Sequence, residues 1–328
     1  MKPALIALCL LAAAPPAFGE ETLSFLALGD TGKTSMLPPL LRPQYRVGEA
    51  LAREDRRSPV AALVFLGDNF YPDGLRRRTL KDRVRENLAA PYCHFLAPTR
   101  RGRHVLRDHC RRAPDETHPV PIVAVLGNHD VGRDQGVTLQ REGIASLIGN
   151  WLMPADARSY ELGAGVSLIA FHSPAVDEGE TAAALERALR ESKGPWRIVI
   201  AHHPIADPGA GWHLEYADRV RAAIRAAGRP VHLFLAGHQH NLQALRDDGA
   251  ALHVVAGAGG AGTYPIEPGH DSERLFGESV LGFARVDASE SALEVTLLGL
   301  AGPFDRSAEP RARFRIRPDR TVEMLALP

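Results

Sequence analysis

The chain has 328 residues, of which 45% are hydrophobic, and this is enough apolar material for one large domain. Lysine and arginine together number 39, as do aspartate and glutamate, so the formal net charge is +0 at pH 7. Because no overall field attracts nucleic acid or an anionic membrane, the composition excludes a binding function driven by bulk charge.

The first 19 residues have the features of a secretory targeting segment. Lys2 supplies a positive start, residues 4–14 form an apolar run too short to span a bilayer comfortably, and residues 17–19 carry small side chains at both positions that define a cleavage site. Cys9 follows Leu8 rather than a small residue, which argues against a lipid anchor. We therefore expect a signal peptide over residues 1–19, one domain over residues 20–328, and a secreted or periplasmic protein without a membrane anchor.

Predicted strands and helices alternate through the first three quarters of the chain. Apolar runs predict strands, and amphipathic periodicity predicts helices. The strands are expected at 23–28, 61–66, 121–126, 165–171, 197–201 and 231–236, and the helices at 45–57, 79–88, 181–190 and 214–227.

Two other regions depart from this alternation. Residues 91–119 read as irregular and rich in arginine and histidine, and beyond Asn241 the pattern changes to short strands and glycine-rich turns at 252–256, 282–287, 293–298 and 314–316. There is no internal repeat and no linker. Alternating elements followed by strands predict an α/β fold of two sheets packed as a sandwich.

Polar motifs follow five of the predicted strands. In open α/β sheets, the carboxyl ends of the strands are where ligand sites form. Two carboxylates, one phenol, one amide and three imidazoles at one edge would be costly to bury in a structural core. The sequence therefore predicts a metal site there, built from Gly29-Asp30-Thr31-Gly32, Gly67-Asp68-Asn69-Phe70-Tyr71, Gly127-Asn128-His129-Asp130, Val199-Ile200-Ala201-His202 and Gly237-His238-Gln239-His240.

The number of donors indicates two metal ions. Seven donor groups exceed the six ligands that one metal ion usually binds, whereas they are enough for two ions that share a bridging carboxylate. Two ions roughly 3.5–4 Å apart form the clamp used for in-line displacement at phosphorus, and they lower the pKa of a bound water. The candidate ligands are Asp30, Asp68, Tyr71, Asn128, His202, His238 and His240.

Some of these residues have simpler interpretations when each is taken alone. Asp30 and Asp68 could cap helices that follow the strands, and Tyr71 could be an aromatic residue at the rim. His232 and His253 lie in apolar strands, so we expect both to be hydrogen-bonded core residues outside the site.

Two cysteines remain after removal of the targeting segment. In an oxidising compartment, Cys93 and Cys110 are expected to form a disulfide, which would stabilise the fold by ~3 kcal/mol through the loop it closes. Two unrelated buried thiols are the alternative. Metal ligation by these cysteines fits poorly, because oxygen and imidazole ligands already fill the expected site.

The motif set resembles the metallophosphoesterase (calcineurin-like) superfamily, and within it the small, tartrate-resistant type of purple acid phosphatase. The resemblance rests on all five motifs in order and extends from about Leu23 to about Gly262. It implies that Asp30, Tyr71 and His240 bind a ferric ion. It also implies that Asn128, His202 and His238 bind ferrous iron, zinc or manganese, that Asp68 bridges the two ions, and that His129 faces the substrate and assists the leaving oxygen as an acid.

The chain departs from the family pattern at several positions. His203 stands where the small purple phosphatases tend to have tyrosine, and His172 stands where relatives often have an acidic residue. By resemblance, His213 is expected to supply a second substrate-facing imidazole. The stretch from Pro98 to His118 is longer than usual, and it could steer anionic substrates, form a partner surface or be a solvated loop held by the disulfide. Its arginines are Arg100, Arg101, Arg103, Arg107, Arg111 and Arg112.

The function implied by the resemblance is that of a binuclear-metal phosphomonoesterase, an acid phosphatase that acts through in-line attack of a metal-bound hydroxide. The expected partner is a small phosphate ester rather than nucleic acid, and the protein is expected to be a monomer. A metal-dependent phosphodiesterase or nucleotide-cleaving hydrolase is the alternative enzyme. A catalytically silent binding module is the alternative from another class, and the intact motif set argues against it.

Overall fold

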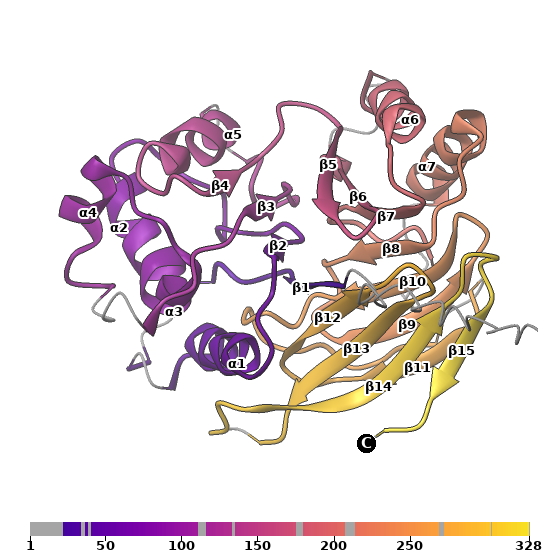
Figure 1. Cartoon of the computed structure of the whole chain (residues 1–328). Helices are drawn as coiled ribbons and strands as arrows, with labels where there is room; N and C mark the ends of the chain where they lie inside the picture. Colours follow the sequence, from indigo (N-terminus) through magenta and orange to yellow (C-terminus); the bar gives the residue numbers. More distant parts are fainter. Residues whose placement is uncertain are drawn as a thin grey trace, which may run out of the picture.

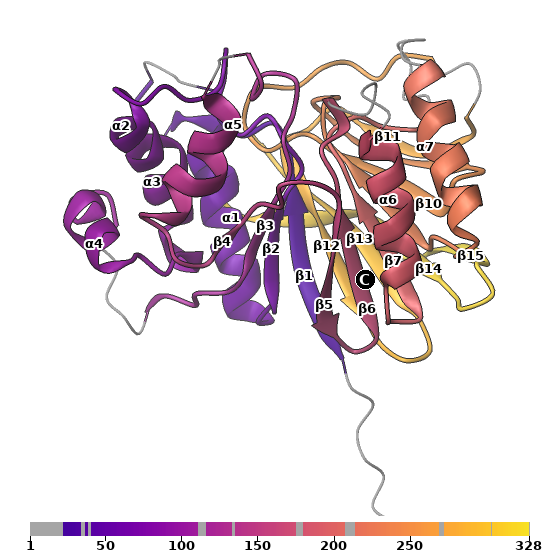
Figure 2. The same cartoon turned by 90° about the horizontal axis from the view of Figure 1, so that it is seen from above.

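Two β-sheets face each other, and helices cover their outer surfaces (Figures 1 and 2). The structure is a computed structural model that describes residues 22–33, 37–38, 41–110, 116–132, 135–174, 180–206, 214–268, 272–302 and 304–327. The predicted signal peptide, residues 1–19, lies outside the described residues. Within the described part, no helix is both long and apolar enough to cross a bilayer.

The first sheet has eight strands and joins both ends of the chain. Its order is β15-β14-β13-β12-β1-β2-β3-β4, in which β1 to β4 run parallel and β12 pairs with β1 in the antiparallel sense. The bounds are β1 Leu23–Leu28, β2 Ala62–Phe65, β3 Ile122–Ala124, β4 Trp151–Leu152, β12 Gly282–Ala288, β13 Leu293–Leu300, β14 Ala308–Ile316 and β15 Val322–Leu325.

The second sheet has seven strands in the order β11-β9-β10-β8-β7-β6-β5. Strands β6, β7, β8 and β10 are parallel, so their carboxyl ends point the same way. The bounds are β5 Arg158–Gly163, β6 Val166–Ala170, β7 Trp196–Ile200, β8 Leu233–Ala236, β9 Leu242–Asp247, β10 Ala250–Ala256 and β11 Arg274–Glu278.

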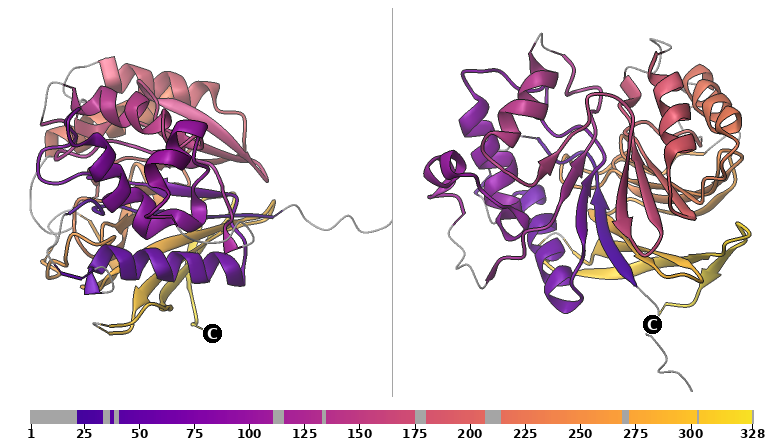
Figure 3. Two further views of the ribbon diagram at one scale, coloured as in Figure 1. Left: turned by 90° about the vertical axis from the view of Figure 1, so that its left-hand side faces the viewer. Right: turned by 45° about the horizontal axis from the view of Figure 1, so that its top comes forward.

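The helices form two separate groups, one on each sheet (Figure 3). The helices α6 (Glu180–Glu191) and α7 (Leu214–Ala227) cover the second sheet, and the others cover the first. This first group comprises α1 Pro43–Arg57, α2 Leu80–Val84 with the π-helix η2 Arg85–Ala89, α3 Ala90–Tyr92, η3 Cys93–Phe95, α4 Arg100–Leu106, and α5 Gly136–Thr138 with the π-helix η5 Leu139–Gly143.

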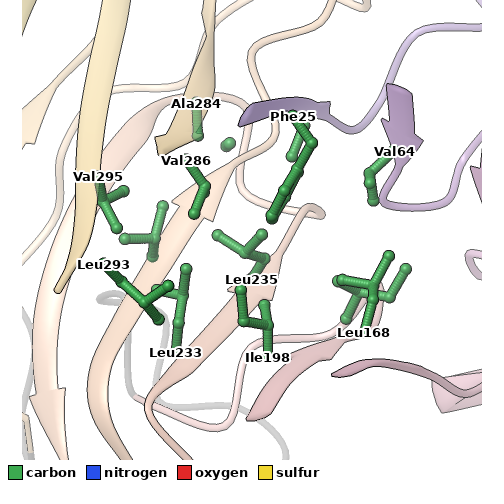
Figure 4. Close-up of a cluster of buried hydrophobic side chains, with 14 of the residues drawn as sticks. Phe25, Val64, Leu168, Ile198, Leu233, Leu235, Ala284, Val286, Leu293 and Val295 are labelled. Carbon is green, nitrogen blue, oxygen red and sulfur yellow. The ribbon is translucent and has the colours of Figure 1, made fainter. Parts of the chain in front are cut away.

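The hydrophobic core lies between the two sheets, as Figure 4 shows. Phe25 of β1 points into this core toward Leu235 and Ile198 of the second sheet, whereas Leu26 and Leu28 pack on the other face beneath α1. Alternation of side chains along a strand allows one apolar run to serve both layers. The predicted two-sheet α/β sandwich is therefore confirmed.

The main difference from the sequence-based expectation lies in residues 91–119. We expected irregular chain, but the segment contains α3, η3 and the helix α4. Thr99 caps α4, because its Oγ1 accepts a hydrogen bond from the amide of Gly102 at 3.0 Å. The expected disulfide between Cys93 and Cys110 is present, with a Cα–Cα distance of 5.2 Å.

Candidate metal centre

The five polar motifs meet at one edge of the sandwich. Three of them follow β1, β2 and β3 of the first sheet, and two follow β7 and β8 of the second. The two sheets approach closely here, since a Cβ atom on Gly29 would lie 3.0 Å from the Cα of Gly237. The amide of His238 donates to Asp30 Oδ2 at 2.7 Å and so ties the two sheets together. Side chains from both halves of the sequence therefore share one site.

The first group of polar atoms is formed by Asp30, Tyr71 and His240. The Tyr71 hydroxyl donates to Asp30 Oδ1 at 3.0 Å and lies 3.0 Å from His240 Nε2. His240 Nε2 is also 3.3 Å from Asp30 Oδ1. All three residues are buried, and Tyr264 stacks on the His240 ring with a centroid distance of 4.0 Å. We call these three residues the buried triad.

The second group is formed by Asn128, His202 and His238, which we call the open triad. His202 Nε2 and His238 Nδ1 each lie 3.0 Å from Asn128 Oδ1, and the two nitrogens are 3.0 Å apart. His202 is buried, whereas Asn128 is exposed and His238 is partly exposed. Solvent or a small molecule can therefore reach this side of the site.

Asp68 lies between the two triads. Its Oδ1 atom is 3.5 Å from His202 Nε2 in the open triad. On the other side, burial raises the pKa of the Tyr71 hydroxyl, and the charges of Asp30 and Asp68 raise it further. Burial also raises the pKa of Asp68 itself. A cation between the triads would reverse both effects by favouring the charged forms of these groups.

The chemistry of the donor atoms fits metal ions. His202 Nδ1 lies 2.9 Å from the carbonyl oxygen of Leu66 and donates its hydrogen there. In the neutral ring, Nε2 therefore presents a lone pair toward the oxygens of Asn128 and Asp68. Several acceptor atoms thus face one another with too few hydrogen-bond donors among them, and a bound cation would satisfy them. Asp30, Asp68 and His202 have ligand atoms within 4.8 Å of one another, as a metal site requires.

Three of the candidate ligands have unusual backbone conformations. Asp30, Asp68 and His238 have φ values of 58°, 50° and 72°, in the left-handed region that non-glycine residues seldom adopt. Such conformations persist only where the surrounding structure imposes them, and they concentrate at functional sites. Gly127 is also constrained, because a Cβ atom there would lie 2.2 Å from Asp68 Oδ1.

His129 lies beside the candidate ligands but is held differently. Its Nδ1 donates to the carbonyl oxygen of Pro72 at 2.6 Å, and its ring lies 4.3 Å from the Tyr71 ring, centroid to centroid. His129 Nε2 is 4.0 Å from Asp68 Oδ2, and the side chain is 39% exposed. The Nε2 atom is therefore the one that can exchange a proton with a bound molecule.

Asp130 is a supporting residue whose role the motif analysis did not assign. Its carboxylate accepts hydrogen bonds from the amides of Asn69, Phe70 and Gly127 at 3.0, 3.0 and 2.9 Å. Burial, followed by the charge of Asp68, raises the pKa of Asp130 to about 6. Asp130 thereby joins the loops that carry Asp68 and His129. The only indication of this role in the sequence was the position of Asp130 at the end of the third motif.

The other histidines discussed above have distinct positions. His172 is buried and accepts from the amide of Leu126 while donating to the carbonyl of Pro154, so it is a structural residue. His203 has a ring nitrogen within 4.8 Å of ligand atoms of His202 and His238. His213 lies outside the described residues.

The two strand histidines lie in the core as expected. His232 Nδ1 accepts from the amide of Arg197 at 3.3 Å, and His253 Nε2 accepts from the amide of Ile205 at 3.2 Å. Both side chains are buried. They take no part in the candidate metal centre.

Comparisons with known proteins point to one family. The family model described as calcineurin-like phosphoesterase matches residues 23–242. Purple acid phosphatase 3 of Arabidopsis thaliana is 24% identical over 318 residues, covering 88% of this chain and 77% of that protein. Purple acid phosphatase 4 of the same organism is 23% identical over 311 residues, covering 86% of this chain and 82% of that protein.

Solved structures share the fold. Purple acid phosphatase PPD1 from yellow lupin (Lupinus luteus) seeds has a TM-score of 0.60 at 16% identity, covering 91% of this chain and 54% of that chain. GAP50, described as the anchor in the inner membrane complex of Plasmodium, has a TM-score of 0.63 at 17% identity, covering 85% of this chain and 84% of that chain. With the family match over most of the described chain, the resemblance seen in the motifs is confirmed: the chain belongs to the calcineurin-like metallophosphoesterase family and is a metal-dependent phosphoester hydrolase.

Proposed function

We propose that this protein is a binuclear-metal phosphomonoesterase of the purple acid phosphatase type. The observation that carries the proposal is the arrangement of the buried and open triads on either side of Asp68. Each triad offers three donors whose atoms already lie within 3.3 Å of one another, and Asp68 can contribute to both.

The two triads differ in the chemistry they offer. The buried triad combines a carboxylate, a phenol and an imidazole, which suits a ferric ion, whereas the open triad has two imidazoles and a neutral oxygen, which suits ferrous iron, zinc or manganese. When bound, two such ions would polarise the phosphate and supply a nucleophile near neutral pH. Asn128 and His238 line the accessible side, so the ester would enter there.

His129 is proposed to act on the leaving group. The bond from Nδ1 to Pro72 fixes the ring, and Nε2 stays on the exposed side of Asp68. A protonated Nε2 can donate to the oxygen that leaves phosphorus and can stabilise charge on the transferring group. His213 remains a second candidate for substrate contact on the family resemblance alone.

The test is release of phosphate by the purified, metal-loaded protein. A chromogenic phosphate monoester should be hydrolysed far faster than the matching diester, and a chelator should abolish the reaction. Faster cleavage of the diester would favour the phosphodiesterase alternative. Full metal loading without activity on either ester would instead favour a silent binding module. Metal analysis of the purified protein identifies the two ions.

A further inference from the structure

The imidazole of His240 in the buried triad lacks the support that the ring of His202 has. His202 Nδ1 donates to the carbonyl oxygen of Leu66 at 2.9 Å, and this hydrogen bond fixes the orientation of that ring. His240 Nε2 faces Tyr71 and Asp30, but His240 Nδ1 is buried without a hydrogen-bond partner among the described residues. A ring that binds a metal through Nε2 therefore needs another contact to hold it.

Tyr264 supplies this contact. Its ring stacks on the His240 ring with a centroid distance of 4.0 Å and an interplanar angle of 11°. Tyr71 meets the His240 ring at 88°, with its hydroxyl 3.0 Å from Nε2. The plane of the His240 imidazole is thus set by Tyr264, while its Nε2 atom is directed into the buried triad.

The segment that carries Tyr264 is bonded to the loops of the metal centre. It follows β10, and the amide of Ala261 donates to the carbonyl oxygen of Asp30 at 2.8 Å. The amide of Tyr264 donates to the carbonyl oxygen of His240 itself at 2.8 Å. The approach is close, since a Cβ atom on Gly257 would lie 2.7 Å from Asp30 Oδ2. Because the backbone is anchored, little further ordering is needed to form the stack.

Tyr264 is not part of the pattern by which the family was identified. It lies outside the five motifs and beyond residues 23–242, which the family model matches. Its side chain is 47% exposed and belongs to none of the hydrophobic core clusters of the described residues. The principal ring contact of Tyr264 is therefore with a candidate ligand rather than with the core.

The stack should be stronger when a metal is bound. A cation on Nε2 withdraws electron density from the imidazole, so the His240 ring becomes positively polarised. The face of a phenol ring is electron-rich and attracts such a ring. Tyr264 therefore stabilises the metal-bound form of His240 more than the free form, and this difference adds to the affinity of the buried triad for its ion.

We propose that Tyr264 is a positioning residue of the metal centre, whose aromatic ring orients His240 and strengthens metal binding by the buried triad. This inference rests on the proposed binuclear site and adds to it a residue that none of the motifs contains. The stacked ring takes the place of the hydrogen bond that His202 has at Nδ1 and His240 lacks.

The test compares three substitutions. Tyr264→Phe keeps the ring, and Tyr264→Leu keeps apolar bulk without an aromatic face. Tyr160→Leu is the control, because it makes the same change in a partly buried tyrosine of β5 whose ring lies under Arg158 instead of at the site. Since Tyr264 is half-exposed, the metal-free Tyr264→Leu and Tyr264→Phe proteins should have similar melting temperatures.

The visible band of the iron-loaded protein reports the buried triad alone, because the absorbing group is Tyr71. Titration with EDTA should remove this band from Tyr264→Leu at a roughly tenfold lower chelator concentration than from the wild type, the loss expected when the support of a ligand is removed. The band should also move to longer wavelength, because less electron density reaches the iron through His240. Tyr264→Phe and the control should stay within about twofold of the wild type and keep the band position.

Two outcomes of this titration would overturn the proposal. Equal behaviour of Tyr264→Leu and Tyr264→Phe would show that the side chain only covers His240 or acts through its hydroxyl. An equal loss in Tyr160→Leu would show a general effect of removing a tyrosine.

A second measurement separates this proposal from the proposed function. In a His238→Ala background the open triad lacks one donor, so calorimetry with zinc reports chiefly the buried triad. Tyr264→Leu should bind zinc roughly tenfold more weakly than Tyr264→Phe in that background. If the wild type hydrolyses no phosphate ester, the proposed function fails, but this difference would still support the role of Tyr264. Equal zinc binding by the two variants would overturn that role, whatever the activity of the protein.

Discussion

The Nε2 atom of His202 lies 3.0 Å from the Nδ1 atom of His238, although the two residues follow different strands, β7 and β8. His202 Nδ1 carries the ring hydrogen and donates it to the carbonyl oxygen of Leu66. The Nε2 atom of the neutral ring therefore has no hydrogen to donate to His238 Nδ1 or to the oxygen of Asn128. Such an arrangement is best satisfied by a cation bound between them. The predictions below test this view of the site and the stability of the fold around it.

Asp68→Asn should lower both the metal content and the activity. An amide retains the shape of the side chain but cannot offer two charged oxygens to two ions, so we expect fewer than two metals per chain and a nearly inactive protein. Elemental analysis with a phosphatase assay measures both. Full metal content in the variant would show that Asp68 does not bridge the ions.

His129→Ala should lower the activity but, unlike Asp68→Asn, should keep the metal content. Since His129 is bonded to Pro72 rather than placed within either triad, both metals should remain. The rate should fall by ~10²–10⁴-fold, the range for loss of an acid or charge-stabilising group. Loss of metal from this variant would show that His129 is a ligand and that the assigned division of roles is wrong.

Tyr71→Phe tests the proposed ferric ion in the buried triad. A phenolate bound to ferric iron absorbs visible light, so the oxidised wild type should be purple or pink and the variant should be colourless. The missing hydroxyl leaves the fold intact, because Phe retains the ring that packs against His129. A visible spectrum of the iron-loaded proteins measures this. A colourless, iron-loaded wild type would contradict the assignment of Tyr71.

The buried His253 should make the fold less stable in acid. Burial lowers the pKa of His253 from 6.5 to about 4, so the folded state resists a proton that the unfolded chain accepts. The free energy of unfolding should therefore be highest above pH 6.5 and fall as the pH drops toward 4, by about 3 kcal/mol in all and by about 2 kcal/mol at pH 5. Denaturant unfolding at pH 5 and pH 7 measures the difference.

His253→Gln should reduce this pH dependence. The amide oxygen can still accept from the backbone of Ile205 but does not titrate. Part of the dependence should remain, because burial also lowers the pKa of His232 to about 4. His104→Gln, at an exposed position on α4, is the control and should behave as the wild type does. If the free energy of unfolding of His253→Gln fell between pH 7 and pH 5 as much as that of the wild type, His253 would not be a cause of the acid sensitivity.

Loss of the disulfide should destabilise the protein without changing the metal centre. Cys93→Ser with Cys110→Ser opens the loop that contains α4, and the unfolded chain gains entropy worth ~3 kcal/mol. Thermal unfolding should show a lower melting temperature, while the KM for a small monoester stays unchanged. A raised KM for that monoester would indicate that α4 also helps to shape the metal centre.

The candidate ligands could be identified from the sequence because each follows a recognisable strand. Apolar runs such as residues 23–28 predict buried strands, and a polar residue just beyond such a run must lie at the carboxyl edge. The helix α7 was likewise expected over the residues that form it, because its apolar positions recur with helical period. By contrast, α4 was missed, because its many arginines obscure the short apolar stripe of Val105 and Leu106.

Local pattern in the sequence therefore determined the strands, the order of the motifs and the types of candidate ligand. The tertiary structure decided which side chains share a triad, that Asp130 holds the loops together, and that the segment carrying Tyr264 is bonded to Asp30. These are contacts between segments far apart in the chain, and they depend on how sheets and helices pack. Periodicity reports which face of an element is buried, but it carries no information about which other element covers that face.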